Sequence, residues 1–292
     1  MPRSLEGKKV ILTGCSRGLG RVIAEAMWKQ GADLLLVARS AVALNRLCGR
    51  LKELSQGDQR VSAFPSDLAE SASPGKIIAE ARQLWSSVDI LVNNAGVIGP
   101  MGMVADNNWR LWREAIQVNL LAPAELCQLS IKWMRETNTE GAIINLSGGG
   151  AASPRPSFSA YATAKCGLVR FTETVAAEVR SLGIRINCIA PGPMNTDMLQ
   201  ETLRAGPDII GHDEYEKVAK FAAGDASDPK LAADLAVYLA SPDSKGITGK
   251  LISAVWDPWR HLQERTDEIQ ESDIYTLRRV LPEERGKVWP NA

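Results

Sequence analysis

A glycine-rich turn between a strand and a helix constrains the fold of this chain more than any other feature. Residues 8–12 form a short apolar run that predicts a buried strand, and apolar residues at helical spacing over 22–27 predict a helix. Between them stand Gly14, Gly18 and Gly20, in the spacing Gly-xxx-Gly-x-Gly. Glycines let the backbone approach a pyrophosphate, whose charge is favoured at the amide-rich N-terminus of a helix. The order of elements therefore predicts a dinucleotide cradle, with a tight connection that binds nothing as the alternative.

The end of the second strand indicates which dinucleotide would bind. The run 34–38 predicts a strand that ends at Arg39, where the adenosine ribose is expected. An acidic residue there suits a ribose 2′-hydroxyl, whereas an arginine suits a 2′-phosphate. Arg39 and Arg17, which lies inside the glycine turn, can clamp the same phosphate, and Asp33 stands at the wrong end of the strand to compete. Two arginines favour NADP over NAD, although each can also be an exposed side chain without a partner.

Two further strands extend the same crevice. The third, residues 60–64, ends near Asp67 and Leu68, which are placed to meet an adenine edge. The fourth, residues 89–92, runs into Asn93-Asn94-Ala95-Gly96 (93–96). Small residues after a parallel strand fit a ligand-lined crevice at the strand ends. The two asparagines can equally form a turn that satisfies its own backbone.

A tyrosine and a lysine four residues apart suggest proton transfer. Tyr161 and Lys165 stand in segment 158–182, whose apolar residues recur at helical spacing, so the two side chains share a face. A free tyrosine has a pKa of about 10, too high for easy proton transfer near neutrality. A nearby cation lowers that pKa and makes the phenol a plausible acid-base group. By itself, such a pair is more often an ordinary helix-surface pair.

Composition excludes several other classes of protein. The chain has 292 residues, with Lys plus Arg equal to Asp plus Glu at 34 each, so no basic excess points to nucleic acid or an anionic membrane. Its five cysteines form no CxxC pair, and neither a signal-like segment nor an apolar run of about 18 residues is present. We therefore expect a cytoplasmic protein. Only His212 and His261 occur, so we expect no metal site and no Ser-His-Asp triad.

Together these motifs resemble the short-chain dehydrogenase/reductase family, in its single-domain branch. The likeness covers about residues 6–250, and its motifs stand in order and at compatible distances. The resemblance implies an α/β fold with a single Rossmann-type, doubly wound parallel sheet of about seven strands in the order 3-2-1-4-5-6-7 and helices on both faces. The motifs are Thr13-Gly14-xxx-Gly18-x-Gly20, Asn93-Asn94-Ala95-Gly96, Asn119, Tyr161-xxx-Lys165 and Pro191-Gly192.

The resemblance also implies an activity and a set of site residues. It implies an NADP(H)-dependent oxidoreductase that interconverts a carbonyl and an alcohol on a small molecule, with Tyr161 as the acid or base. Lys165 would hold the nicotinamide ribose and lower the pKa of the tyrosine, and Asn119 would anchor a water that links Lys165 to solvent. The stretch after the strand 185–189 would contact the nicotinamide amide. The expected cofactor-binding residues are Gly14, Ser16, Arg17, Gly18, Leu19, Gly20, Arg39, Asp67, Leu68, Asn94, Ala95, Gly96, Tyr161, Lys165, Pro191, Gly192 and Thr196.

One residue that the resemblance calls for is missing. The family usually has a serine thirteen positions before the tyrosine, where it donates a hydrogen bond to the substrate oxygen, but this chain has Gly148. Losing one such donor typically costs about 10²–10³ in rate. Ser147 is a candidate catalytic replacement, although a continued strand pattern would point it to the other face; Ser153, Ser157, Ser159 or a glycine amide are further candidates. The gap keeps two alternatives open: a cofactor-binding sensor or scaffold without turnover, and an epimerase or lyase that uses a bound nicotinamide cofactor.

The sequence of the second half of the chain predicts a mobile lid and an unusual tail. The irregular stretch 194–228 stands where the family has its substrate lid, and Met194, Met198, Leu199 and Leu203 in it form either pocket walls or the buried face of a lid helix. A helix over 231–239 and a last strand over 247–255 follow. We expect a catalytic domain over 1–255 and a tail over 256–292, with polar helical sequence over 260–280, that packs on the domain or on a neighbouring subunit and narrows the substrate entrance. Resemblance also suggests a homodimer or homotetramer.

Overall fold

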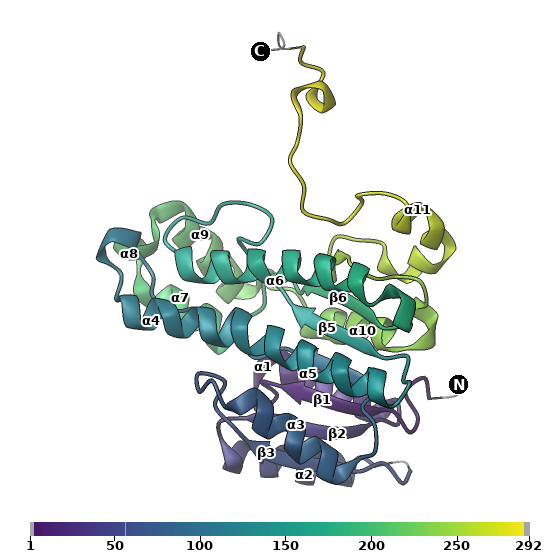
Figure 1. The fold of residues 1–292 in the computed structure, drawn as a ribbon. Coiled ribbons are helices and arrows are strands. Elements are labelled where there is room, and N and C mark those ends of the chain that lie inside the picture. The colour runs from purple at the N-terminus through teal and green to yellow at the C-terminus, as the bar shows by residue number, and fades with distance from the viewer. Residues whose placement is uncertain (1–2, 56, 289–292) are drawn as a thin grey trace.

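A seven-stranded parallel sheet forms the centre of the computed structural model, which describes residues 3–55 and 57–288 (Figure 1). The strands are β1 Lys9–Thr13, β2 Asp33–Ala38, β3 Val61–Pro65, β4 Ile90–Asn93, β5 Ala142–Leu146, β6 Arg185–Ala190 and β7 Leu251–Ser253. Their order in the sheet is β3-β2-β1-β4-β5-β6-β7, and all neighbours pair in parallel. This order confirms the doubly wound Rossmann-type arrangement that the resemblance implied.

The connections between the strands are mainly helical, as parallel pairing requires. Two π-helical turns, at Gln117–Leu121 and Phe221–Asp225, adjoin helices near the cleft described below. The α-helices of the described residues are α1 Gly18–Lys29, α2 Ala41–Glu53, α3 Ser73–Leu84, α4 Trp109–Ile116, α5 Ala122–Glu136, α6 Ser159–Glu178, α7 Asp197–Ala205, α8 Pro207–Ile210, α9 His212–Lys220, α10 Pro229–Ala240 and α11 Thr266–Gln270.

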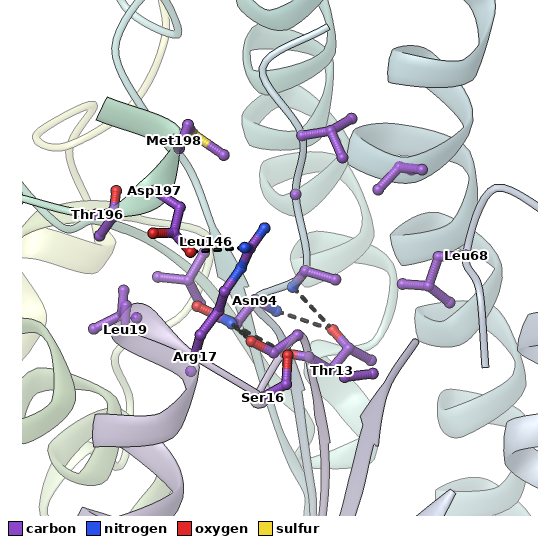
Figure 2. Close-up of a pocket in the computed structure, with 18 of the residues that line it drawn as sticks. Thr13, Ser16, Arg17, Leu19, Leu68, Asn94, Leu146, Thr196, Asp197 and Met198 are labelled. Atoms are coloured by element: carbon purple, nitrogen blue, oxygen red, sulfur yellow. Dashed lines mark hydrogen bonds and ion pairs between the residues drawn. The ribbon is translucent and has the colours of Figure 1, made fainter. Parts of the chain in front are cut away.

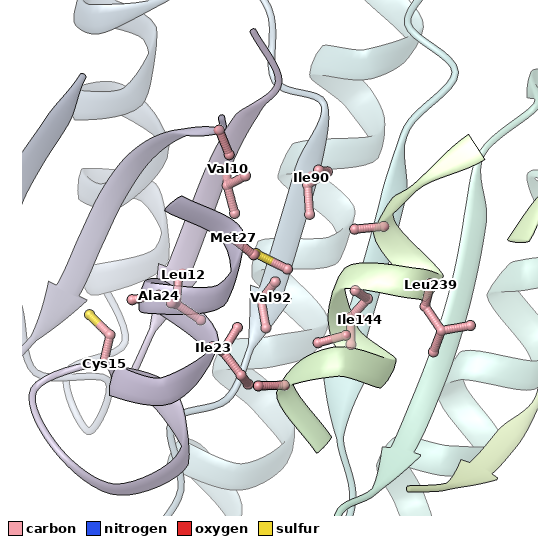
Figure 3. Packing of buried hydrophobic residues seen from close by; sticks show 14 of the residues in the cluster. Val10, Leu12, Cys15, Ile23, Ala24, Met27, Ile90, Val92, Ile144 and Leu239 are labelled. Atoms are coloured by element: carbon pink, nitrogen blue, oxygen red, sulfur yellow. The ribbon is translucent and has the colours of Figure 1, made fainter. Parts of the chain in front are cut away.

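Two helical layers cover the sheet because successive strand residues face opposite sides. In β1, Val10 and Leu12 belong to a buried cluster with residues of α1, α2 and α10, whereas Ile11 belongs to a second cluster with residues of α3, α5 and α6. Figure 3 shows Ile23 and Met27 of α1 against the strand residues of the first cluster. Because the strands are parallel, their carboxyl ends lie at one edge of the sheet, and burial on both faces leaves that edge open to a ligand.

The last strand and the tail differ from the sequence prediction. The predicted strand over 247–255 is shorter, because Gly246 and Gly249 take φ values of 89° and 73°, which interrupt extended backbone. The segment 260–280 was predicted to be helical, but it holds a 3₁₀ stretch at Trp259–Arg265, the short helix α11 and irregular chain after it.

The tail contacts its own chain over much of its described length. Trp259 and Leu262 lie in the main buried cluster. The backbone amide of Leu251 in β7 donates to the carbonyl of Tyr275 (2.8 Å), and that of Leu277 donates to Oε1 of Glu173 on α6 (2.6 Å). The tail thus satisfies backbone groups at the outer edge of the sheet. Its last residues, 289–292 with Trp289, lie outside the described residues, and the division at 255/256 stays a prediction.

None of the described helices combines the length and the apolar character that crossing a membrane would require.

Candidate active site

A cleft of about 730 Å³ lies at the carboxyl ends of β1 to β6, and Figure 2 shows part of its lining. Most of the residues expected from the sequence line it together. Asn119 and Gly192 do not, and both are described below. The expected residues in the lining are Gly14, Ser16, Arg17, Gly18, Leu19, Gly20, Arg39, Asp67, Leu68, Asn94, Ala95, Gly96, Ser147, Tyr161, Lys165, Pro191 and Thr196.

The glycine turn leaves no room for side chains at two positions. A Cβ on Gly14, whose φ is 69°, would lie 2.6 Å from the Cα of Ala95, and a Cβ on Gly20 would lie closer than 3.0 Å to the carbonyl oxygen of Gly14. The first turn of α1 receives no side-chain cap. Its backbone amides are therefore available to an anion in the cleft, as the sequence pattern predicts.

Asn94 holds the glycine turn against β4. Its side-chain nitrogen Nδ2 donates to the carbonyl oxygens of Thr13 (3.1 Å) and Gly14 (3.0 Å). The hydroxyl of Thr13 in turn accepts from the backbone amides of Asn94 and Ala95 (Figure 2). Asn93 is buried instead, and its side chain donates to Oδ1 of Asn145 on β5 (2.9 Å). The two asparagines therefore hold strands together and do not form a self-satisfied turn.

The two arginines expected at the adenosine end occupy different positions in the cleft. Arg39 is exposed at the end of β2, beside Ser40, whose hydroxyl caps α2 by accepting from the amide of Ala43 (3.2 Å). Arg17 pairs with Asp197 at the start of α7, with 2.7 Å between Nη1 and Oδ2 (Figure 2). Both partners of that pair are more than half exposed, so the pair contributes little energy. Arg17 thus reaches across the cleft toward the lid in this structure.

Tyr161 and Lys165 lie one turn apart on α6 and are both buried. The ammonium of Lys165 donates to the carbonyl oxygen of Leu146 (2.7 Å) and lies 5.7 Å from the centre of the Tyr161 ring. Burial lowers the pKa of Lys165 to about 8. Burial also raises the pKa of Tyr161, and the charge that opposes this shift is that of Arg155. That Lys165 lowers the pKa of Tyr161 stays a prediction, and the charge that does oppose the effect of burial in this structure is that of Arg155.

The space next to Gly148 is filled by the tyrosine. A Cβ on Gly148 would lie closer than 3.0 Å to the hydroxyl oxygen of Tyr161 and 3.0 Å from the ring atoms Cε1 and Cζ. Ser147 does line the cleft, although a continued strand pattern would turn it away, because β5 ends at Leu146. Its hydroxyl is buried and has no hydrogen-bond partner in the described chain. Among the candidate serines, Ser147 is therefore the one nearest in the sequence to the position of the missing serine.

Asn119 and Gly192 support the cleft from outside its lining. Asn119 lies in the π-helical turn, fully buried; its Oδ1 accepts from the amide of Val97 (3.1 Å), and its Nδ2 donates to the carbonyls of Val97 (2.8 Å) and Ala115 (2.9 Å). Its side chain is thus hydrogen-bonded to backbone, and the predicted water link to Lys165 stays a prediction. Gly192 has a φ of 82°, and a Cβ there would lie 2.8 Å from the hydroxyl of Ser227. It therefore shapes the turn after β6.

The helical part of the predicted lid spans residues 197–225, called the lid segment from here on, and packs on the tyrosine. Met198, Ala205 and Tyr215 of this segment join a buried cluster that contains Phe158 and Tyr161. Both sequence interpretations of the lid methionines hold in part, since Met198 lines the cleft and also packs in this cluster. Met194, before the lid segment, lines the cleft and packs on the main core, whereas Leu199 and Leu203 are not in the lining.

Sequence reasoning missed one ionic contact of this cluster. Arg155 precedes α6 and donates two hydrogen bonds to Oε1 of Glu214 on α9, at 2.8 and 2.6 Å. The two residues are 59 positions apart, and the only local signal is the pair of prolines that flank the arginine. None of the cleft-lining residues belongs to the described part of the tail, and the described chain holds no group of three or more His, Cys, Asp or Glu residues placed to hold a metal ion.

Comparison with known proteins identifies the family of this architecture. The sequence profile of the family described as short chain dehydrogenase matches residues 8–206. Dehydrogenase/reductase SDR family member 4 of Caenorhabditis elegans is 29% identical over 250 residues, which cover 86% of this chain and 94% of that protein. The 3-oxoacyl-(acyl-carrier-protein) reductase of Vibrio harveyi is 31% identical over 255 residues, which cover 85% of this chain and 96% of the reductase.

A solved structure has the same fold. A Beutenbergia cavernae protein, named only provisionally as an NAD(P)-dependent gluconate 5-dehydrogenase, was crystallised with NADP at low occupancy. It superimposes with a TM-score of 0.75 at 27% identity, over 87% of this chain and 97% of that one.

Proposed function

This chain belongs to the short chain dehydrogenase family of oxidoreductases, and we propose that it interconverts a carbonyl and an alcohol on a small molecule with NADP(H). The single observation that carries the proposal is that Tyr161 and Lys165 line the same cleft as the glycine turn. An acid-base group and an anion cradle thus face one continuous space. A related reductase and a structure with bound NADP support this reading.

The residues of the cleft fit a dinucleotide. Gly14 and Gly20 stand where any Cβ would collide with backbone, which is how a glycine turn makes room for a pyrophosphate. Arg39 at the end of β2, with Asp33 at the other end of that strand, favours the 2′-phosphate of NADP. When bound, the nicotinamide would supply or accept the hydride.

The protein's own residues would handle the proton. Tyr161 would donate its hydroxyl proton to the carbonyl oxygen in reduction and accept a proton from the alcohol in oxidation. Lys165, held by the Leu146 carbonyl, would keep a positive charge beside that site and hold the nicotinamide ribose. The unpartnered hydroxyl of Ser147 would donate to the substrate oxygen in place of the side chain that Gly148 lacks. Asn119 would keep the 95–97 segment in place through Val97.

An activity assay tests this proposal. Purified protein would be mixed with NADPH and a panel of ketones and aldehydes, and loss of nicotinamide absorbance would be followed, with NADH in parallel. We expect oxidation of NADPH, faster than that of NADH, with at least one carbonyl.

A second candidate function, a cofactor-binding sensor or scaffold without turnover, is favoured by two observations. Gly148 removes a usual donor, and burial raises the pKa of Tyr161. Tight NADPH binding by calorimetry, with no oxidation across the whole panel, would support the sensor and refute the oxidoreductase.

Assembly and location remain predictions. We propose a homodimer or homotetramer that forms through the helices carrying Asn119 and Tyr161, and light scattering after size-exclusion chromatography would measure its mass. We also propose that residues 1–255 form the catalytic domain and that the protein acts in the cytoplasm. A fluorescent fusion imaged in its native cells would test the location.

A further inference from the structure

One partly buried ion pair joins the lid to the segment before α6. Nε and Nη2 of Arg155 both donate to Oε1 of Glu214, and the two side chains are 21% and 24% exposed. A pair that is largely removed from solvent is screened less than the exposed pairs elsewhere on this surface. It connects two segments 59 residues apart, so it can resist their separation.

The guanidinium of Arg155 also lies against the aromatic residues of the site. Its central carbon is 3.9 Å from the centre of the Phe158 ring and 6.0 Å from that of Tyr161. Both distances fall within the range of cation–π attraction. The arginine also lies beside Gly149, where a Cβ would be in ordinary contact with Nη1, at 3.6 Å. The arginine therefore contacts the lid on one side and the tyrosine's helical turn on the other.

The lid is built so that few contacts hold it. Gly206, Gly211 and Gly224 have φ values of 79°, 84° and 135°, and a Cβ on any of them would meet open space. Positive φ and free surroundings let the chain change direction there. Between these glycines the large apolar side chains that the lid buries are Ile210 and Val218, and Tyr215 is partly buried against the cluster around Tyr161. A single ion pair can then decide a large part of the balance between closed and open forms.

We propose that Arg155 is a positioning residue that latches the lid over Tyr161 through Glu214, so that closure of the lid and placement of the proton-transfer group are coupled. The proposal rests on the proposed function, because it takes Tyr161 as the acid or base. Arg155 lies outside the cleft lining and acts through the lid and the tyrosine.

The latch makes the proton-transfer group sensitive to the state of the lid. The charged and titratable groups near Tyr161 are Lys165 on its own helix, Arg155 before that helix, and Glu214 and Tyr215 on α9, while the residues packed on it from the 97–101 segment and α7 are apolar. The charge of Arg155 opposes the rise in the pKa of Tyr161 that burial causes. Removing that charge should raise the pKa further, so alcohol oxidation, which needs the phenolate, should shift to higher pH.

The test compares Arg155→Met, Arg155→Lys and Glu214→Gln with a matched control. Arg82→Met is that control, because Arg82 pairs with Glu136 at 2.6 Å and lies 4.8 Å over the Trp133 ring, away from the cleft. Opening is measured by trypsin cleavage within residues 204–220, which hold Arg204, Lys217 and Lys220. Function is measured as kcat and KM against pH in both directions, with NADPH affinity and melting temperature to show that each variant is folded.

Arg155→Met should be cleaved about tenfold faster in the lid, as expected for loss of a partly buried pair. Its kcat/KM should fall by a similar factor, and its oxidation profile should move to higher pH, with NADPH affinity unchanged. Glu214→Gln should open the lid but move the pH profile less, since the arginine stays charged, and Arg155→Lys should recover part of both effects. Exchanging the two residues, Arg155→Glu with Glu214→Arg, should restore part of kcat/KM; activity is the measurement for this variant because the new arginine is itself a trypsin site.

Wild-type cleavage and an unchanged pH profile in Arg155→Met would overturn the latch, and so would equal effects in Arg82→Met. If the wild-type protein turns over no carbonyl at all, the proposed function fails, while trypsin cleavage still decides whether the pair holds the lid.

Discussion

Restoring the missing serine should damage this protein. A Cβ on Gly148 would lie closer than 3.0 Å to the hydroxyl of Tyr161, a separation that real Cβ atoms essentially never show. To reach ordinary van der Waals contact, the phenol oxygen must move by about 1 Å, and a misplacement of that size can cost about 10² in rate. We therefore expect Gly148→Ala and Gly148→Ser to lower kcat by about 10²-fold, although the serine matches the family pattern.

The assay must separate displaced chemistry from lost folding or lost cofactor binding. Carbonyl reduction would be measured at saturating NADPH, NADPH affinity by fluorescence titration, and stability by thermal unfolding. Overpacking of a buried site costs about 1–3 kcal/mol, so the melting temperature should fall by a few degrees while the cofactor still binds. The loss should appear in kcat, because the cradle of Gly14 and Gly20 lies after β1 and in the first turn of α1, whereas Gly148 follows β5.

Gly149→Ala is the matched control. It adds the same methyl group one residue later, where the nearest atom, Nη1 of Arg155, would lie 3.6 Å away in ordinary contact. We expect its kcat to stay within about twofold of the wild type. A Gly148→Ser variant that is faster than wild type at unchanged NADPH affinity would refute the packing argument and show that only a donor was lacking.

Three further substitutions test the other parts of the site. Tyr161→Phe should abolish turnover while NADPH affinity stays the same, because only the hydroxyl is removed; residual wild-type turnover would assign proton transfer elsewhere. Arg39→Asp should shift the ratio of the kcat/KM values for NADPH and NADH toward NADH by repelling the 2′-phosphate; an unchanged ratio would show that Arg39 does not select the cofactor. Lys165→Met should stop turnover and yet raise the free energy of unfolding at pH 7 by up to about 3 kcal/mol. Burial lowers the pKa of Lys165 from 10.5 to about 8, so at pH values below 8 the folded wild type carries a buried charge that costs stability. In denaturant titrations this difference should fade between pH 8 and 10.5, as the folded wild type loses the proton; a lower stability of the variant at pH 7 would contradict it.

The sheet and the cradle were predictable because local patterns determine them. Short, largely apolar runs specify buried parallel strands, and the structure has the predicted strands, apart from the last one, within one residue. The glycine turn was predictable because the residues it needs are local: a Cβ at Gly14 or Gly20 would collide with backbone. The last strand was overestimated because Gly249 takes the left-handed conformation, with a φ of 73°, and the sequence does not say which glycines will do so.

The electrostatic setting of the tyrosine was not predictable in the same way. A helical spacing places Tyr161 and Lys165 on one face, but it does not say that the lysine will bond to the Leu146 carbonyl. The opposing charge comes from Arg155, whose partner Glu214 lies in the irregular lid. A pKa depends on burial and on charges from every surrounding segment, so periodicity within one helix gives only part of it.

The glycine run explains why the departure from the family pattern cannot be treated as a simple loss. Two of the three glycines stand where a side chain would collide with a neighbour: Gly148 with the phenol of Tyr161 and Gly150, at a φ of 92°, with Ala162, while Gly149 lies beside the guanidinium of Arg155 with space for a methyl group. The glycine at 148 and Arg155 are therefore parts of one packing arrangement around Tyr161. A serine at 148 would require the tyrosine to move, and a moved tyrosine would disturb the ring beside which Arg155 and the lid are placed. The combined variant Gly148→Ser with Arg155→Met should consequently lose less kcat than the sum of the two separate losses, because residues that share a partner are coupled.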